Sequence, residues 1–317
     1  MRIIAKRKVA DTAKVLIIIS ITLLIYGIVV SLNSNYALVD PVKDVEVINS
    51  DDTTISITPS EGNEVIKGGE ANPNSNNRQS NIKDNVSIEK KNDLLRKEIE
   101  KEFTIKVKYG NETEGYKVGG ITTVAMTDQE SIYEKLNSLY DTLSLYPDGF
   151  FKEIYDGGIP LTIYLINNYS EDGITGITDS SYEYANISIA TIYDFSESFY
   201  HESYHYIERY LFKRKANFNS WDSLNPSTFE WSTIDGGLSY SNTFREDAYF
   251  VNNYAQTNAA EDRASTFEYM MASTKASCLN KDNPVWYKAN YIAMTIESVF
   301  KTVDSDSIEY WERFIKN

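Results

Sequence analysis

Cysteine is nearly absent from this sequence and basic residues are fewer than acidic ones, and each shortage excludes a class of protein. The single cysteine, Cys278, excludes an intrachain disulfide framework and any zinc site built on several cysteines. Acidic residues outnumber basic ones by 46 to 31, and the formal net charge of −15 argues against nucleic acid as a partner. With 42% hydrophobic residues, the 317-residue chain can nevertheless bury a sizeable core.

One long apolar run lies near the N-terminus, at residues 15–32, and it contains no charged side chain. As a helix, at about 1.5 Å per residue, this run spans about 27 Å, which is enough for the core of a bilayer. Basic residues precede it within 1–14, and acidic residues soon follow it, so the positive-inside rule places 1–14 in the cytoplasm. We therefore predict a single-pass protein of the cell membrane with an extracellular domain. The alternative is a signal peptide cleaved after Ala37, which would give a secreted protein.

Residues 33–86 are rich in Asn, Ser, Asp, Thr, Gly and Pro and contain almost no aromatic residues. Such a segment cannot bury enough apolar area to offset its chain entropy, so it is predicted to be a flexible, low-complexity stalk. The folded domain is then expected at 87–317. Export without disulfides, together with a composition rich in Asn, Ile, Lys and Tyr, indicates a Gram-positive bacterium.

The expected domain has strands in its first half and helices in its second half. Alternating apolar residues or short apolar runs predict strands at 103–109, 160–166 and 185–191. Helical spacing predicts helices at 85–102, 128–145, 195–213, 258–275 and 284–301. This order is typical of an α+β fold, with a small mixed sheet followed by a mainly helical C-terminal part.

Both histidines of the chain fall in one pentapeptide, His201-Glu202-Ser203-Tyr204-His205, which has the HExxH pattern. Residues four apart lie on one face of a helix, so two imidazoles can reach one metal ion. Glu202 follows His201 directly and is expected to point away from the two imidazoles, toward an open coordination position of the metal. There it is predicted to take a proton from a zinc-bound water. Asp194 and Glu197, spaced as a capping box, support the helix. The alternative is a surface helix with two incidental histidines.

A catalytic zinc ion needs a third protein ligand, and with no further histidine in the chain that ligand must be a carboxylate. After HExxH comes Tyr-x-x-Thr-Asn-x-Ala-Glu at 254–261, which opens the predicted helix at 258–275. This combination resembles the gluzincin metallopeptidases related to the catalytic domain of anthrax lethal factor. The Glu-Asp-Arg-Ala continuation resembles uncharacterised bacterial zinc peptidases, and the resemblance covers roughly 185–275.

The resemblance implies a zincin-like metalloprotease domain with one catalytic Zn²⁺ ion. It makes Glu261 the third ligand and makes Tyr254 the hydroxyl that stabilises the oxyanion. The competing interpretations are an acidic residue favoured by a helix N-terminus for Glu261, and a core tyrosine for Tyr254.

The sequence departs from thermolysin-type relatives at one position. In those relatives a carboxylate four residues after the glutamate ligand orients a zinc-bound histidine, and here that position is Ser265. We expect Asp262, Asp235 or Asp247 to take over this role.

These patterns predict a zinc-dependent peptidase that hydrolyses a protein or peptide at the outer face of the membrane. The strand at 185–191 is expected to be an open sheet edge over the zinc helix, where an extended substrate can pair. The alternative for this strand is an ordinary position inside the sheet. The alternatives for the function are a non-catalytic zinc-binding or adhesion-type domain, and a stalked binding module without a metal.

Overall fold

The computed structural model describes residues 86–233, 248–272, 279 and 281–316. The predicted membrane helix at 15–32 lies outside these residues, as does the predicted stalk up to residue 85. Among the described residues, no helix combines the length and the apolar character that a membrane crossing needs.

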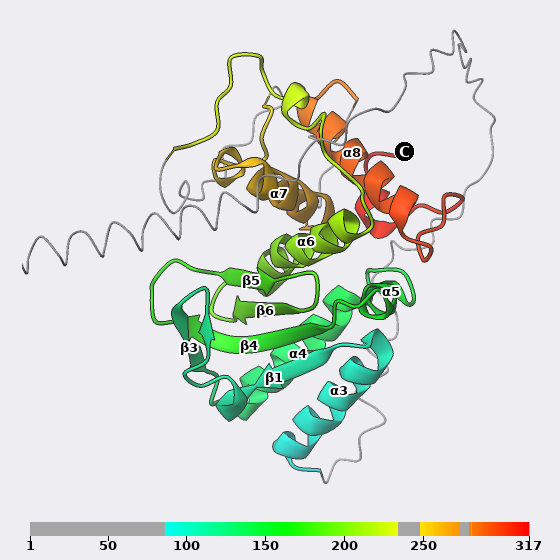
Figure 1. Cartoon of the computed structure of the whole chain (residues 1–317). Helices are drawn as coiled ribbons and strands as arrows, with labels where there is room; N and C mark the ends of the chain where they lie inside the picture. The colour runs from blue at the N-terminus through cyan, green and yellow to red at the C-terminus, as the bar shows by residue number, and fades with distance from the viewer. Residues whose placement is uncertain (1–85, 234–247, 273–278, 280, 317) are drawn as a thin grey trace, which may run out of the picture. The chain divides into compact units, whose positions relative to one another are not determined.

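The described structure contains a mixed sheet of six strands, which lies next to α6 (Phe195–Lys213) (Figure 1). Its strands follow the order β2-β3-β4-β6-β5, and β1 also pairs with β4. β4 runs parallel to β1 and β6 and antiparallel to β3, while β5 is antiparallel to β6. The strand bounds are β1 (Lys106–Tyr109), β2 (Lys117–Val118), β3 (Ile121–Ala125), β4 (Leu161–Tyr169), β5 (Gly176–Ser180) and β6 (Ala185–Ala190).

The alternation of side chains along β4 explains how both faces of the sheet are covered. Ile163 and Leu165 point to the main core, which also contains buried residues of the helices. Tyr164 and Ile166 point to the opposite face, into a smaller cluster with Val118 of β2. The sheet is therefore buried on both sides at its centre.

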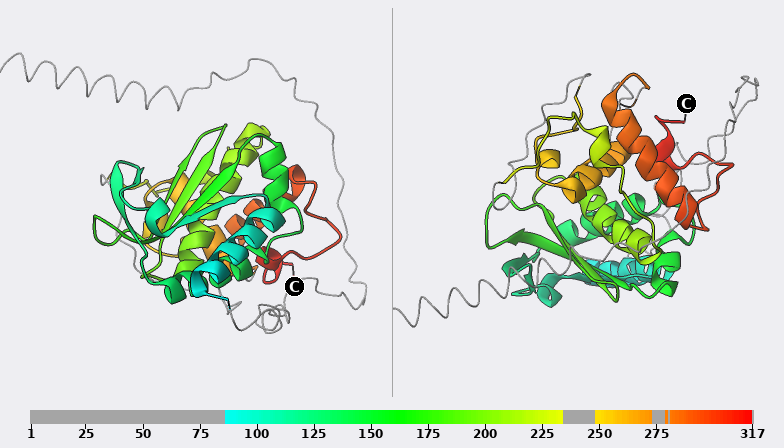
Figure 2. Two further views of the ribbon diagram at one scale, coloured as in Figure 1. Left: turned by 90° about the horizontal axis from the view of Figure 1, so that it is seen from below. Right: turned by 45° about the horizontal axis from the view of Figure 1, so that its top comes forward.

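The helices lie in two layers beyond the main face of the sheet. Views from two directions place α6 between the sheet and the pair α7 and α8 (Figures 1 and 2). The site described below lies where β5, α6 and α7 meet. The helix bounds are α3 (Ile88–Phe103), α4 (Gln129–Leu143), α5 (Phe150–Asp156), α6 (Phe195–Lys213), α7 (Ala259–Ala272) and α8 (Pro284–Val299).

The strand predicted at 185–191 is not the edge of the sheet, so that expectation was wrong. β6 pairs with β4 on one side and with β5 on the other. Ser188 of this strand is fully buried and hydrogen-bonded to the Tyr169 hydroxyl. The strand next to α6 with one unpaired side among the described residues is β5, which the sequence patterns did not predict.

The other predicted elements differ from the structure mainly at their ends. The predicted strand at 103–109 begins only at Lys106, because Phe103 is the last residue of α3. The helix predicted at 195–213 has the bounds of α6, and those at 258–275 and 284–301 correspond to α7 and α8.

Candidate metal centre

Helix α6 places both histidines on one face. Its N-terminus is capped by Asp194, whose carboxylate accepts a hydrogen bond from the Glu197 amide at 3.1 Å. The following turns are buried against the core, which fixes the rotation of the helix about its axis. His201 and His205, one turn apart, consequently face α7 with ring centroids 5.0 Å apart.

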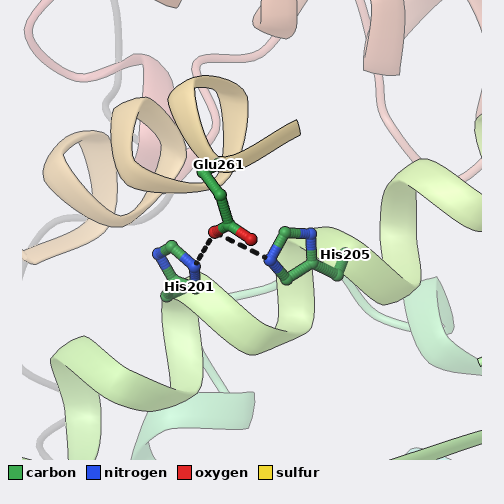
Figure 3. A group of neighbouring side chains, drawn as sticks. All are labelled: His201, His205 and Glu261. Carbon is green, nitrogen blue, oxygen red and sulfur yellow. Dashed lines mark hydrogen bonds and ion pairs between the residues drawn. The ribbon is translucent and has the colours of Figure 1, made fainter. Parts of the chain in front are cut away.

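Helix α7 supplies a carboxylate to the same point. The side chain of Asn258 accepts hydrogen bonds from the Ala260 and Glu261 amides and so starts this helix. One carboxylate oxygen of Glu261, Oε2, then lies 3.0 Å from Nε2 of His201 and 3.5 Å from Nε2 of His205 (Figure 3). The structure thus brings together all three predicted zinc ligands, with their ligand atoms within 4.8 Å of one another.

The charges around the histidines favour a cation. Burial alone would lower the pKa of His201, but its hydrogen bonds to Glu261 and Glu268 raise that pKa to about 10. Burial likewise opposes ionisation of Glu261, yet the two imidazoles hold its pKa well below the usual range. Together with Glu202, three largely buried carboxylates surround two imidazoles, so the cluster needs positive charge from protons or from a metal ion.

The residues present fit a zinc ion. Two imidazole nitrogens and one carboxylate oxygen form the protein ligand set of many catalytic zinc sites, which keep a further position for water or substrate. In the described part of the chain, no other group of three or more His, Cys, Asp or Glu residues brings its ligand atoms together in this way.

Glu268 orients His201, a role for which the sequence suggested other residues. The Nδ1 atom of His201 lies 3.1 Å from Oε2 of Glu268, and that contact directs the opposite nitrogen, Nε2, toward Glu261. Asp262 does not take this part, because it accepts hydrogen bonds from Trp221 and Lys288 instead. Asp235 and Asp247, the other two candidates, lie outside the described residues.

Strand β5 holds Glu202, and this contact was not predicted. The Thr178 hydroxyl lies 2.7 Å from Oε2 of Glu202 and 2.9 Å from its backbone carbonyl oxygen. Gly176, on the same face of β5, leaves the room for the carboxylate: a Cβ atom there would lie 2.6 Å from Cγ of Glu202. The Glu202 side chain of α6 is therefore held against Gly176 and Thr178 of β5.

Tyr254 lies in a short 3-10 helix, Tyr254–Gln256, just before α7. Its ring centroid is 5.8 Å from that of His201, and its side chain is partly buried. Burial, together with the charges of Glu261 and Glu202, raises the pKa of the phenol. This tyrosine thus borders the cluster and stays a neutral hydrogen-bond donor.

Comparison with known proteins finds a distant structural match. No protein-family model matches this chain, and no curated protein matches it. A solved structure titled a "putative zinc-binding metallo-peptidase", from Bacteroides caccae, is 16% identical in sequence, with a TM-score of 0.49. The match covers 72% of this chain and 91% of that chain.

Proposed function

We propose that this protein is a zinc-dependent peptidase of the gluzincin type. The observation that carries the proposal is the convergence of His201 and His205 from α6 with Glu261 from α7. These three residues would hold one zinc ion. When bound, the ion would supply a Lewis acid that polarises a peptide carbonyl and lowers the pKa of water.

Two side chains of the protein have separate roles in the reaction: Glu202 transfers the proton, and Tyr254 donates a hydrogen bond. Glu202 is the general base, which takes a proton from the attacking water and returns it to the amine of the leaving peptide. Its hydrogen bond to Thr178 keeps the carboxylate aimed from α6 toward the strand. The Tyr254 hydroxyl donates to the oxygen on which negative charge develops, at the rim of the cluster.

The substrate of this peptidase is an extended segment of a protein or peptide. β5 pairs with β6 on one side, and its other side has no strand partner among the described residues. A peptide added there as a further strand would run beside Gly176 and Thr178, which contact Glu202. We propose this pairing for β5 in place of the strand at 185–190.

We further propose that residues 15–32 form a transmembrane helix that anchors the peptidase domain to the cell membrane. Their uncharged apolar sequence and the basic residues before them support a cytoplasmic N-terminus and a peptidase domain outside the cell.

The test of the proposal is peptide cleavage by the purified, zinc-loaded protein and by its Glu202→Gln variant. A peptide library is incubated with each protein, and the products are identified by mass spectrometry. The wild type is expected to cleave a subset of peptides, and the variant to retain zinc while its kcat falls at least about 100-fold. Glu197→Gln, an exposed change on the same helix, is the matched control with wild-type turnover. Zinc binding without any cleavage by the wild type would favour a non-catalytic zinc domain.

A further inference from the structure

A cavity of about 280 Å³ opens beside the metal centre, between β5, α6 and α7. His205 and Glu261 belong to its wall, so it is continuous with the proposed zinc position. Its volume is several times the roughly 30 Å³ that one water molecule occupies in the liquid, so it admits a side chain rather than a single ion. The rest of its lining comprises Thr178, Ser180, Glu208, Arg209, Phe212, Asn258 and Ala260.

Arg209 is the cationic side chain in this lining. It follows His205 by four residues, so it lies one turn, or about 6 Å along the axis, beyond the metal ligand on the same face of α6. Its guanidinium carbon lies 5.3 Å from the ring centroid of Tyr182, which supports the side chain from one side. The buried Nε atom has no hydrogen-bond acceptor among the described residues.

The two carboxylates in the wall do not neutralise Arg209. Glu208 is hydrogen-bonded to the buried side chain of Arg263, and Glu261 is bonded to the two histidines. The N-terminus of the 14-residue helix α7 also lies at the cavity, where Asn258 and Ala260 line it, and helix N-termini carry partial positive charge. Within the described part of the chain, the cavity therefore has a cationic donor whose Nε atom has no acceptor, and it also has a favourable helix end. Both features attract an anion.

We infer that this cavity is a substrate subsite for an acidic side chain, the carboxylate of an aspartate or glutamate close to the cleaved bond. The inference rests on the proposed function and specifies the substrate class for that site. A substrate strand on β5 would pass Thr178 and Ser180, which line both the strand face and the cavity. Its side chains that point toward α6 would enter the cavity and meet the Arg209 guanidinium.

The first arm of the test measures specificity. Each position around the bond in a cleaved peptide is changed in turn to Glu or to its neutral isostere Gln, and kcat/KM is measured for both. At one position the wild type is expected to favour Glu about tenfold or more, the size of one charge-assisted hydrogen bond. Arg209→Gln is expected to bring this ratio near one, and Arg209→Lys to keep part of it. Arg214→Gln removes a charge of the same sign from the exposed end of α6 and should leave the ratio unchanged.

The second arm measures binding and does not depend on turnover. Two dipeptide hydroxamates that differ only as Glu and Gln are titrated by calorimetry into zinc-loaded wild type and Arg209→Gln. The expected result is tighter binding of the Glu compound to the wild type, with the difference lost in the variant. Equal affinities for the wild type, or binding of neither compound, overturn the subsite. A wild type that cleaves no peptide but still distinguishes the two hydroxamates contradicts the proposed peptidase and leaves the acidic subsite supported.

Discussion

Replacing Gly176 by alanine tests whether β5 positions the general base. The added Cβ would lie 2.6 Å from Cγ of Glu202 and 2.9 Å from its Oε1 atom. Carbon atoms in contact prefer separations of about 3.5–4.0 Å, so the Glu202 side chain must withdraw by about 1 Å. A misplacement of that size can slow an enzyme about 100-fold, and it would also strain the 2.7 Å contact from Thr178.

The assay combines turnover with metal content. Gly176→Ala is expected to lower kcat about 100-fold on a cleaved peptide and to keep its zinc, because the three ligands belong to α6 and α7. Asp179→Ala is the matched control, since Asp179 lies on β5 but on the face opposite Thr178. Wild-type turnover by a folded, zinc-containing Gly176→Ala protein would refute the positioning role of the strand.

Three further predictions address the residues around the centre. Glu268→Gln is expected to weaken zinc binding about 10- to 100-fold in a competition titration, because His201 loses the carboxylate that orients it; unchanged affinity would contradict this role. Lys288→Met leaves the fully buried Asp262 carboxylate without its ionic partner and should lower the free energy of unfolding by about 3–5 kcal/mol, as measured in urea; a loss under about 1 kcal/mol would argue against an ionised pair. Tyr254→Phe should lower kcat about 100-fold with zinc content unchanged. An unchanged kcat would show that the hydroxyl takes no part in the reaction and that Tyr254 only packs against its neighbours.

Helix α6 was predictable because its signals are local. Asp194 at the N-cap and the apolar spacing that follows are contained in the sequence of α6 itself, and the structure shows the same bounds. His201 and His205 were recognisable for the same reason, since four residues make one turn. The approach of Glu261 over a separation of 60 residues came from the resemblance to a family rather than from any local signal.

The edge strand was not predictable from local patterns. β5 has the sequence Gly-Ile-Thr-Asp-Ser, with one strongly apolar residue and no alternation, and all five residues are half-buried. Its place is fixed by its antiparallel register with β6, in which Thr178 lies opposite Ile187. Strand order depends on such long-range pairing, which local patterns do not show. The edge was therefore assigned to the more apolar strand at 185–191, which is β6.

The orienting carboxylate was missed for a geometric reason. The expectation considered the position four residues after Glu261, and then Asp235, Asp247 and Asp262. Glu268 instead follows Glu261 by seven residues, two turns along the same face of α7. Asp262 was excluded by its neighbours, since the buried Lys288 ammonium and the Trp221 indole both donate to it. Positions i+3, i+4 and i+7 all lie on the same helix face as Glu261, and Glu268 is the i+7 position.

If two imidazoles and the Glu261 carboxylate bind one metal ion, the purified protein must contain one zinc ion per chain. Protein purified without a polyhistidine tag is equilibrated with zinc, freed of unbound metal and analysed for its elements. The wild type is expected to hold one zinc ion per chain, and Glu261→Ala and His205→Ala to lose it. Because the chain has only two histidines, no other histidine can replace them. A metal-free wild type, or variants that keep a full equivalent of zinc, would show that these three residues do not bind the ion.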